Sequence, residues 1–178
     1  MPIRSPAGAV AEGMMIDAKK AALLIAVVAA TTSCSGDLGS GPQTTYGNIR
    51  YTAAVQDISG TTTGSTAHQF SVFVTLTNKI GASQTRTYPV NCPVLIRLYR
   101  QSDQTIVYDE TRSRDCSTTT ATVTIPGTGT AQLQSGVRFP SVILGDSLPK
   151  AVYNAKAALL TEGSQFLIID AGLMDLSK

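Results

Sequence analysis

Apolar and polar side chains alternate with a period of two along several short segments of this chain. In the clearest segment, Phe70–Thr77, every second residue is apolar, namely Phe70, Val72, Val74 and Leu76. The intervening residues are Ser and Thr apart from Phe73, which therefore falls on the opposite face. A period of two is typical of a β-strand that packs one face against a core, so we predict a strand here.

Further short segments rich in β-branched and aromatic residues are separated by turns that contain Gly, Pro and Ser. They are Asn48–Gln56, Thr85–Tyr88, Val94–Arg100, Thr105–Asp109, Thr119–Ile125, Ala131–Phe139, Ala151–Leu160, Phe166–Ile169 and Leu173–Leu176. Ala155–Leu160 has helical propensity, but the flanking Val152 and Tyr153 and the turn that follows favour a strand. Short strands without a convincing helix predict an all-β fold, a sandwich or a barrel, and we expect an antiparallel β-sandwich of about seven to nine strands.

The composition agrees with this fold class and narrows the function. The chain has 178 residues, of which 15% are charged, and its formal net charge is +2. Thr is plentiful, and it favours strands because its branched Cβ crowds a helix. No stretch concentrates Lys and Arg, so we do not expect a nucleic-acid partner.

The N-terminal region has the pattern of an export signal. Lys19 and Lys20 precede the apolar run Ala21–Ala30, and small residues lead from there to Cys34. A run of about ten apolar residues is too short to span a bilayer, which takes about 20. The order of charge, apolar run and small residues is that of a secretory signal. We therefore predict that residues 1–33 comprise an upstream extension and a signal peptide, with Met14 or Met15 as the expected start.

The placement of Cys34 after the apolar run resembles the lipobox of bacterial lipoproteins. The resemblance implies that Cys34 is lipidated and becomes the new N-terminus. Thr31 stands where the family usually has an aliphatic residue, and ordinary cleavage after Ala30 is the alternative. Lipidation of Cys34 would leave Cys92 and Cys116 as a pair, as exported domains favour. Ser35, which follows the cysteine, suggests by the same resemblance the outer membrane of a two-membrane envelope.

These patterns divide the chain into three parts. Residues 1–33 are the extension and signal peptide. Residues 34–45 are the lipidated cysteine and a flexible tether, because they are rich in Gly, Ser and Pro and lack periodicity. Residues 46–178 are the folded sandwich, expected on the periplasmic or outer face of the envelope.

Cys92 and Cys116 are expected to form a disulfide. They lie at the start of one predicted strand and just after its hairpin partner, which brings them within bonding range. Closing this loop of about 25 residues would stabilise the fold by roughly 3–4 kcal/mol. The alternative is a redox or metal pair, but the chain has no CxxC motif and one His, which makes a poor zinc site.

The chemistry of an enzyme is not evident in the sequence. His68 is the single histidine, and we interpret it as a solvated residue at a strand end, with a hydrolase that uses His68 as the alternative. The motifs of nucleophile elbows, phosphate loops and zinc proteases are absent. We predict that the chain is not an enzyme and that it needs no cofactor and no metal ion.

A charged loop and three aromatic side chains are the candidate contact surface. Arg112 and Arg114 lie among Asp109, Glu110 and Asp115, and we interpret these five residues as a solvated loop tethered by the predicted disulfide. A loop held in this way is a common place for a contact. Three aromatic residues are expected on the outward faces of their strands, and together they would form an apolar patch: Phe73, Tyr88 and Tyr99.

Part of the strand pattern resembles the BsuPI-type intracellular proteinase inhibitor domain. The similar residues are Phe70–Asn78, a strand ending in Asn, and the hairpin of Val94–Tyr99 with Ile106–Tyr108. Val152–Leu160 occupies the place of the family's last motif, although Pro149-Lys150 replaces Pro-Gly and the chain has no Trp. The resemblance covers about residues 46–170 and implies a non-enzymatic, immunoglobulin-like interaction domain.

The predicted function is that of a non-enzymatic, lipid-anchored domain of the cell envelope. It is expected to act as a protein-binding module or as a structural subunit of an envelope assembly. Its partners are expected to be the membrane, through the lipid, and another envelope protein. The alternatives are a proteinase-inhibitor-like domain and a sandwich that binds a carbohydrate or another small ligand.

Overall fold

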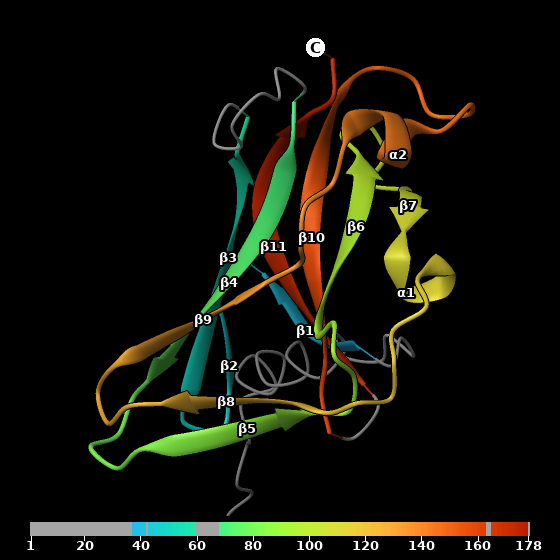
Figure 1. Cartoon of the computed structure of the whole chain (residues 1–178). Coiled ribbons are helices and arrows are strands. Elements are labelled where there is room, and N and C mark those ends of the chain that lie inside the picture. Colours follow the sequence, from blue (N-terminus) through green and yellow to red (C-terminus); the bar gives the residue numbers. More distant parts are fainter. Residues whose placement is uncertain (1–36, 42, 60–67, 163–164, 178) are drawn as a thin grey trace, which may run out of the picture. The chain divides into compact units, whose positions relative to one another are not determined.

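Two β-sheets face each other across an apolar core in the computed structural model (Figure 1). The structure describes residues 37–41, 43–59, 68–162 and 165–177. The strands are β1 (Asp37–Gly41), β2 (Gln43–Tyr46), β3 (Ile49–Asp57), β4 (Phe70–Asn78), β5 (Gln84–Tyr88), β6 (Val94–Arg100), β7 (Ile106–Asp109), β8 (Ala121–Ile125), β9 (Thr130–Gln134), β10 (Val152–Leu160) and β11 (Phe166–Asp175). The predicted all-β sandwich is confirmed, with more strands than expected.

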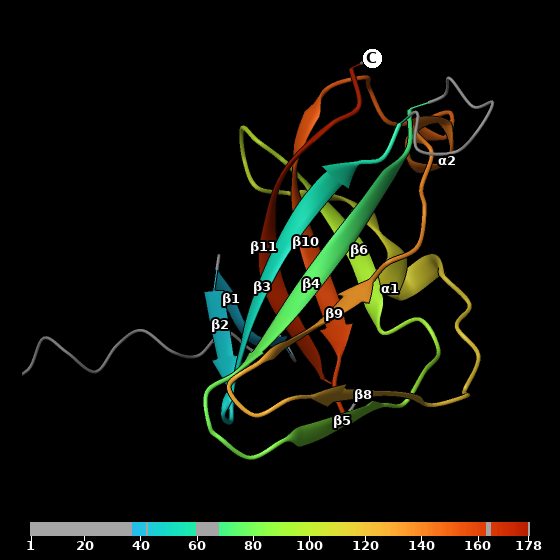
Figure 2. The same cartoon turned by 60° about the vertical axis from the view of Figure 1, so that its left-hand side comes forward.

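The strands form three sheets. The five-stranded sheet has the order β1-β11-β10-β6-β7, the four-stranded sheet the order β2-β3-β4-β9, and β5 pairs with β8. The pairing is antiparallel throughout except that β1 runs parallel to β11. Strands β3 and β4 pack against β11, β10 and β6 across the core, as Figure 2 shows from a second side.

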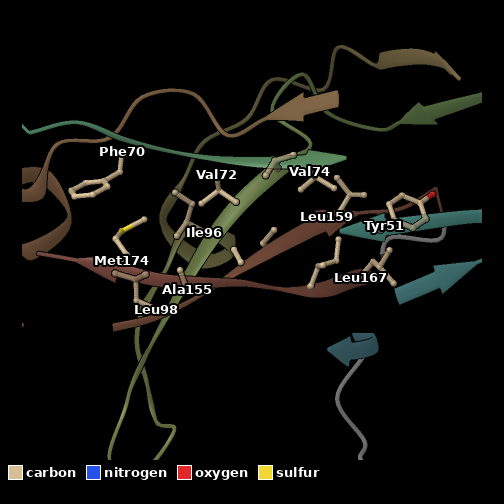
Figure 3. Close-up of a cluster of buried hydrophobic side chains, with 14 of the residues drawn as sticks. Tyr51, Phe70, Val72, Val74, Ile96, Leu98, Ala155, Leu159, Leu167 and Met174 are labelled. Carbon is tan, nitrogen blue, oxygen red and sulfur yellow. The ribbon is translucent and has the colours of Figure 1, made fainter. Parts of the chain in front are cut away.

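The core follows the predicted alternation. Phe70, Val72, Val74 and Leu76 of β4 are all buried. Figure 3 shows side chains of β4 facing Ile96 and Leu159 of the opposite sheet. Because these residues lie on one face of each strand, they fill a single layer between the sheets.

Strand β10 resolves the local conflict in the sequence in favour of a strand. Its alternate residues Ala155, Ala157 and Leu159 are buried in the core, and it pairs on both sides, with β6 and with β11. Small side chains suit this central position because both neighbouring strands and the opposite sheet approach closely. Strand β11 is continuous where two strands were predicted, and Gly172 adopts a φ of +86° close to a shift in register with β10.

The prediction of a flexible tether is wrong for part of residues 34–45. Asp37–Gly41 forms β1 and Gln43–Tyr46 forms β2, and they extend the edges of two different sheets. The side chains of β2 are mostly exposed. An edge strand is held by backbone hydrogen bonds along one side, so it needs no apolar alternation and escapes a search for it. Residues 1–33 and Cys34 lie outside the described residues, as does most of the loop predicted between β3 and β4.

Two short helices interrupt the β pattern. They are α1 (Glu110–Ser113) and α2 (Pro140–Leu144). Asp109 caps α1 by accepting a hydrogen bond from the Thr111 amide, and Pro140 stands in the first turn of α2. One turn is too short to show a helical period, which explains why neither helix was predicted. The helices among the described residues lack the length and apolar character needed to cross a bilayer.

The predicted disulfide between Cys92 and Cys116 is confirmed, with their Cα atoms 5.7 Å apart. Both cysteines pack against a small apolar cluster of Leu95, Ala158 and Ile168. This cluster lies on the face of the five-stranded sheet that points away from the main core, because its residues alternate with core residues along their strands. The disulfide therefore covers an outer apolar patch.

Candidate binding site at one edge of the sandwich

The most distinctive polar cluster lies where the outermost strands β7 and β9 of the two sheets end. Strand β7 leads directly into α1, and β9 continues through an irregular segment to α2, which Figure 2 shows rising from β9. Glu110 begins α1, and Arg138 lies in the segment before α2. Their oppositely charged side chains extend toward each other from the two sheets.

A β-bulge turns Arg138 inward. Strand β9 pairs with β4 in a regular register up to Gln134, but Phe70 then pairs with Arg138 where the same register would give Val137. One extra residue therefore lies between, at Gly136, whose φ is +76°. A one-residue shift exchanges the two faces of a strand, so Arg138 points to the core side and Val137 points outward.

Glu110 and Arg138 form a buried, bidentate ion pair. Nε of Arg138 donates to Oε1 of Glu110, and Nη2 donates to Oε2 at 3.3 Å. Glu110 is 2% exposed and Arg138 is 5% exposed. Removing one partner of such a pair leaves an uncompensated buried charge, so the pair joins the two sheets tightly at this edge.

Each oxygen of Glu110 accepts two hydrogen bonds. Besides the two from Arg138, Oε1 accepts one from the hydroxyl of Tyr108 at 3.1 Å, and Oε2 accepts one from the backbone N–H of Ile96 at 2.9 Å. The bond to Ile96 continues the hydrogen bonding of β6 beyond the end of β7. A carboxylate offers about four acceptor positions, and here all of them are used.

Two further donors of Arg138 bind backbone carbonyls, so four of its five N–H donors are used. Nη1 donates to the carbonyl of Val137 at 2.8 Å, and Nη2 donates to the carbonyl of Ser135 at 2.9 Å. The guanidinium is therefore fixed by its own segment as well as by Glu110. Arg138 therefore contributes a positive charge at a fixed position on this edge.

Arg114 places a second positive charge near Glu110, whose oxygens already accept hydrogen bonds from other groups. Its backbone N–H donates to the carbonyl of Glu110 at 3.0 Å and so closes α1. Its Nη1 lies 3.7 Å from Oε1 of Glu110, and its side chain is 35% exposed. Because the oxygens of Glu110 are already occupied, this contact is electrostatic, and the three charged groups carry a net charge of +1.

A pocket of about 320 Å³ opens beside these groups. It is lined by Tyr108, Glu110, Ser113, Arg114, Val137, Arg138 and Val142. Val142 of α2 is 64% exposed, and the nearby Val137 and Phe139 are also exposed. The pocket thus combines buried charged groups with exposed apolar side chains, so it offers both kinds of contact to a bound group.

Burial raises the pKa of Tyr108 to about 12, and the negative charge of Glu110 adds to this effect. The phenol therefore stays protonated and donates to Glu110 at neutral pH.

Asp109, which directly precedes Glu110, points to the opposite, outer face of the five-stranded sheet. It accepts a hydrogen bond from Nε of Arg97 at 3.1 Å, and the guanidinium of Arg97 lies 5.5 Å from the centre of the Phe166 ring.

The structure corrects the interpretation of the charged loop. Glu110 is buried and Asp109 is nearly so, whereas a solvated loop was predicted. Asp109 pairs with Arg97 of the adjacent strand β6, and Glu110 pairs with Arg138 from a distant part of the chain, which makes their burial possible. Arg112, by contrast, has a side chain that is 83% exposed. Sequence reasoning missed Arg138, whose one signal was a lone cation between Val137 and Phe139.

The three aromatic residues predicted as a contact patch are dispersed. The prediction that Tyr88 is a contact residue is wrong, since Tyr88 is 3% exposed and belongs to the main apolar core. Phe73 is partly exposed on the outer face of β4. Tyr99 lies on the outer face of the other sheet, under the ammonium of Lys156 at 4.5 Å. Of the two arginines and three aromatic residues predicted as contacts, Arg114 is the one that lines the pocket.

His68 lies beside Asp57 and Ser59 but without the geometry of a catalytic triad. Its Nδ1 is 3.2 Å from the Ser59 hydroxyl and 3.5 Å from Oδ2 of Asp57, so both groups meet the same ring nitrogen. A triad needs the carboxylate on one nitrogen and the nucleophile on the other. Ser59 also donates to Asp57, which lowers the pKa of that carboxyl group. No group of three or more potential metal ligands is found within the described ranges.

Comparisons with known proteins add little. No protein-family model and no curated protein matches the sequence. The chain is similar to a solved structure described as the X-ray structure of Northeast Structural Genomics Consortium target SoR45. The two share 12% identity, the match covers 74% of this chain and 87% of the other, and the TM-score is 0.31. A similarity at this level assigns neither fold nor function.

Proposed function

We propose that this chain is a non-enzymatic, lipid-anchored domain of the cell envelope that binds another envelope protein at the pocket beside α1 and α2. The observation that carries the proposal is that Arg114 lies in the same pocket as the exposed side chains of Val137 and Val142. Its guanidinium has N–H groups without a hydrogen-bond acceptor among the described residues. An arginine next to apolar side chains is a typical composition for the centre of a protein interface.

The chemistry of the pocket favours recognition over catalysis. Glu110 could serve as a general base only if one of its oxygens were free to take a proton, and both are occupied by donors. Arg138 is fixed in the same way. The hydrogen bonds between Glu110 and Arg138 hold both side chains in place, which supports binding because these two groups need no rearrangement when a partner docks.

Site-specific crosslinking in the native envelope tests this proposal. A photoreactive residue at Val142, at the rim of the pocket, is expected to capture one defined envelope protein. The same residue at Thr122, which is exposed on β8 away from the pocket lining, serves as the control. Recovery of the uncrosslinked chain from both positions would argue against a partner at this site.

The lipid anchor is a separate part of the proposal. It rests on the signal-like pattern before Cys34. A Cys34→Ser variant is expected to lose the mass of the lipid and to be released from the membrane fraction. An unchanged intact mass and an unchanged distribution would contradict lipidation.

Carbohydrate binding is a second candidate, favoured by the outer face of the four-stranded sheet. Residues paired across its strands point the same way and form two polar rows beside the partly exposed Phe73. The rows are Thr45, Arg50, Thr77 and Thr130, and Gln43, Thr52, Thr75 and Gln132. Hydroxyl and amide groups around one aromatic ring suit a sugar. Sedimentation with isolated peptidoglycan tests this, with Phe73→Ala expected to reduce binding and Tyr99→Ala, on the other sheet, to leave it unchanged.

Proteinase inhibition stays a prediction from the sequence resemblance. Titration of the purified chain against a panel of serine proteases tests it directly. Absence of inhibition at micromolar concentrations would remove this function.

A further inference from the structure

We infer that the pocket beside α1 and α2 recognises a carboxylate that adjoins an aliphatic side chain, presented by a peptide segment of the partner. The inference rests on the proposed protein-binding function and specifies the chemistry of the same site. It follows from how the donors and acceptors of three charged residues are distributed.

The surplus of positive charge is located on Arg114. Glu110 neutralises one of the two arginines, and its four acceptor positions are taken by Arg138, Tyr108 and Ile96. Arg138 directs four of its five N–H donors at Glu110 and at two backbone carbonyls, and its side chain is buried. The guanidinium of Arg114 makes no hydrogen bond to any described residue, and its contact with Glu110 at 3.7 Å is longer than a hydrogen bond.

A carboxylate is the group that best matches a guanidinium with unfilled donors. The planar fork of arginine binds the two oxygens of a carboxylate through parallel hydrogen bonds, at about twice the strength of neutral ones. Arg114 is partly shielded in the pocket, so water weakens such a bond less than it would on an open surface. The end of α1 holds its backbone in place.

The rim determines what adjoins the carboxylate. Val137 and Val142 line the pocket and are exposed to solvent, so an aliphatic group that covers them removes apolar surface from water. A volume of about 320 Å³ lies at the small end of the range for ligand sites. It admits one or two residues of a peptide. Both a C-terminal carboxylate and an Asp or Glu side chain next to an aliphatic residue fit this description.

Titration of the full chain with four short peptides tests the inference and separates these two sources. The probes are N-acetyl-Ala-Leu, its C-terminal amide, N-acetyl-Leu-Glu-amide and N-acetyl-Leu-Gln-amide. Binding is followed by the backbone amide shifts of Ser113, Arg114 and Val142. We expect saturable shifts with a peptide that carries a carboxylate and none with its neutral counterpart. Equal binding of acid and amide would overturn the inference.

A matched pair of variants assigns the effect to the pocket. Arg114→Gln is expected to weaken carboxylate binding about tenfold or more, whereas Arg112→Gln changes it less than about twofold. Both changes remove one positive charge from the same short segment, but Arg112 does not line the pocket. An equal loss in both variants would overturn the inference, because it would reflect general charge attraction.

The crosslinking experiment distinguishes the two levels of the proposal. If Val142 captures a partner and no peptide carboxylate binds, the ligand chemistry is wrong and the proposed function stands. If carboxylate peptides bind in the expected pattern and no partner is captured in the envelope, the chemistry is right and the proposed function falls.

Discussion

Asp109 and Glu110 are neighbours in the sequence, yet they serve opposite faces of the same sheet. Glu110 points toward the core and meets Arg138 from the other sheet, with both side chains almost fully buried. Asp109 points outward and meets Arg97 on the adjacent strand, with side chains that are 8% and 11% exposed. One ion pair therefore joins two sheets, and the other reinforces a single sheet.

The outer face has a further support that the inner edge lacks. The disulfide between Cys92 and Cys116 covers the small cluster of Leu95, Ala158 and Ile168. On the inner side, the ion pair itself closes the space where β7 and β9 end. The inner edge therefore depends on an ion pair between the sheets, whereas the outer face has both an ion pair and a covalent link.

Loss of the inner pair has the largest expected effect. Glu110→Gln leaves the buried guanidinium of Arg138 without its counter-charge, so we expect the free energy of unfolding to fall by about 3–5 kcal/mol. Urea denaturation measures it. The double variant Glu110→Gln with Arg138→Met removes both charges and is expected to lose less than Glu110→Gln alone. Additive losses in the double variant would show that the two side chains do not act as a pair.

Removal of the disulfide has the next largest effect. A variant with Cys92→Ser and Cys116→Ser is expected to lose about 2–4 kcal/mol, because the closed loop no longer restricts the unfolded chain. Reducing agent provides the control, since it should lower the urea midpoint of the natural chain to that of the variant and leave the variant unchanged. If reducing agent left the urea midpoint of the natural chain unchanged, the prediction would be contradicted.

The outer ion pair has a smaller expected effect. Asp109→Ala removes the cap of α1 and the partner of Arg97, and we expect a loss of about 1–2 kcal/mol by thermal or urea unfolding. Arg112→Ala provides the matched control, because Arg112 contacts the same carboxylate at 3.5 Å from an exposed position. That variant is expected to lose less than about 0.5 kcal/mol. Equal losses of stability in the two variants would mean that the buried contact with Arg97 contributes no more than the exposed contact with Arg112.

Alternation in the sequence predicted the sandwich and the core face of β4, and the residues on either side of Ala155–Leu160 predicted the strand β10. It failed at Arg138 because the bulge at Gly136 is a local exchange of faces. A continuous strand over Ala131–Phe139, as predicted, places Val137 inward and Arg138 outward, the reverse of the structure. Since a single inserted residue reverses the pattern, periodicity alone could not bring Arg138 to Glu110.

The pocket depends on the same local geometry and was only partly predictable. Arg114 was a candidate contact residue, but its partners come from segments that are distant in sequence and meet only in the folded sandwich. The outward placement of Tyr88 failed for a related reason. Strand β5 belongs to a separate two-stranded sheet, and the orientation of that sheet is set by packing against the core and not by its own short pattern.

Alkaline pH gives the smallest and most selective test of the inner face. Tyr108 has a pKa of about 12 in the fold against an ordinary value near 10, so the unfolded chain loses this proton first. Its contribution is fully present below pH 10 and declines as the pH rises from 10 to 12. Tyr108→Phe lacks the bond to Glu110 and should be about 1 kcal/mol less stable at pH 8. Since Tyr51 and Tyr88, whose pKa values are also raised, titrate in both proteins, the difference between the two urea curves isolates Tyr108. We expect that difference to shrink between pH 10 and 12, and a constant difference would show that folding does not raise the pKa of Tyr108.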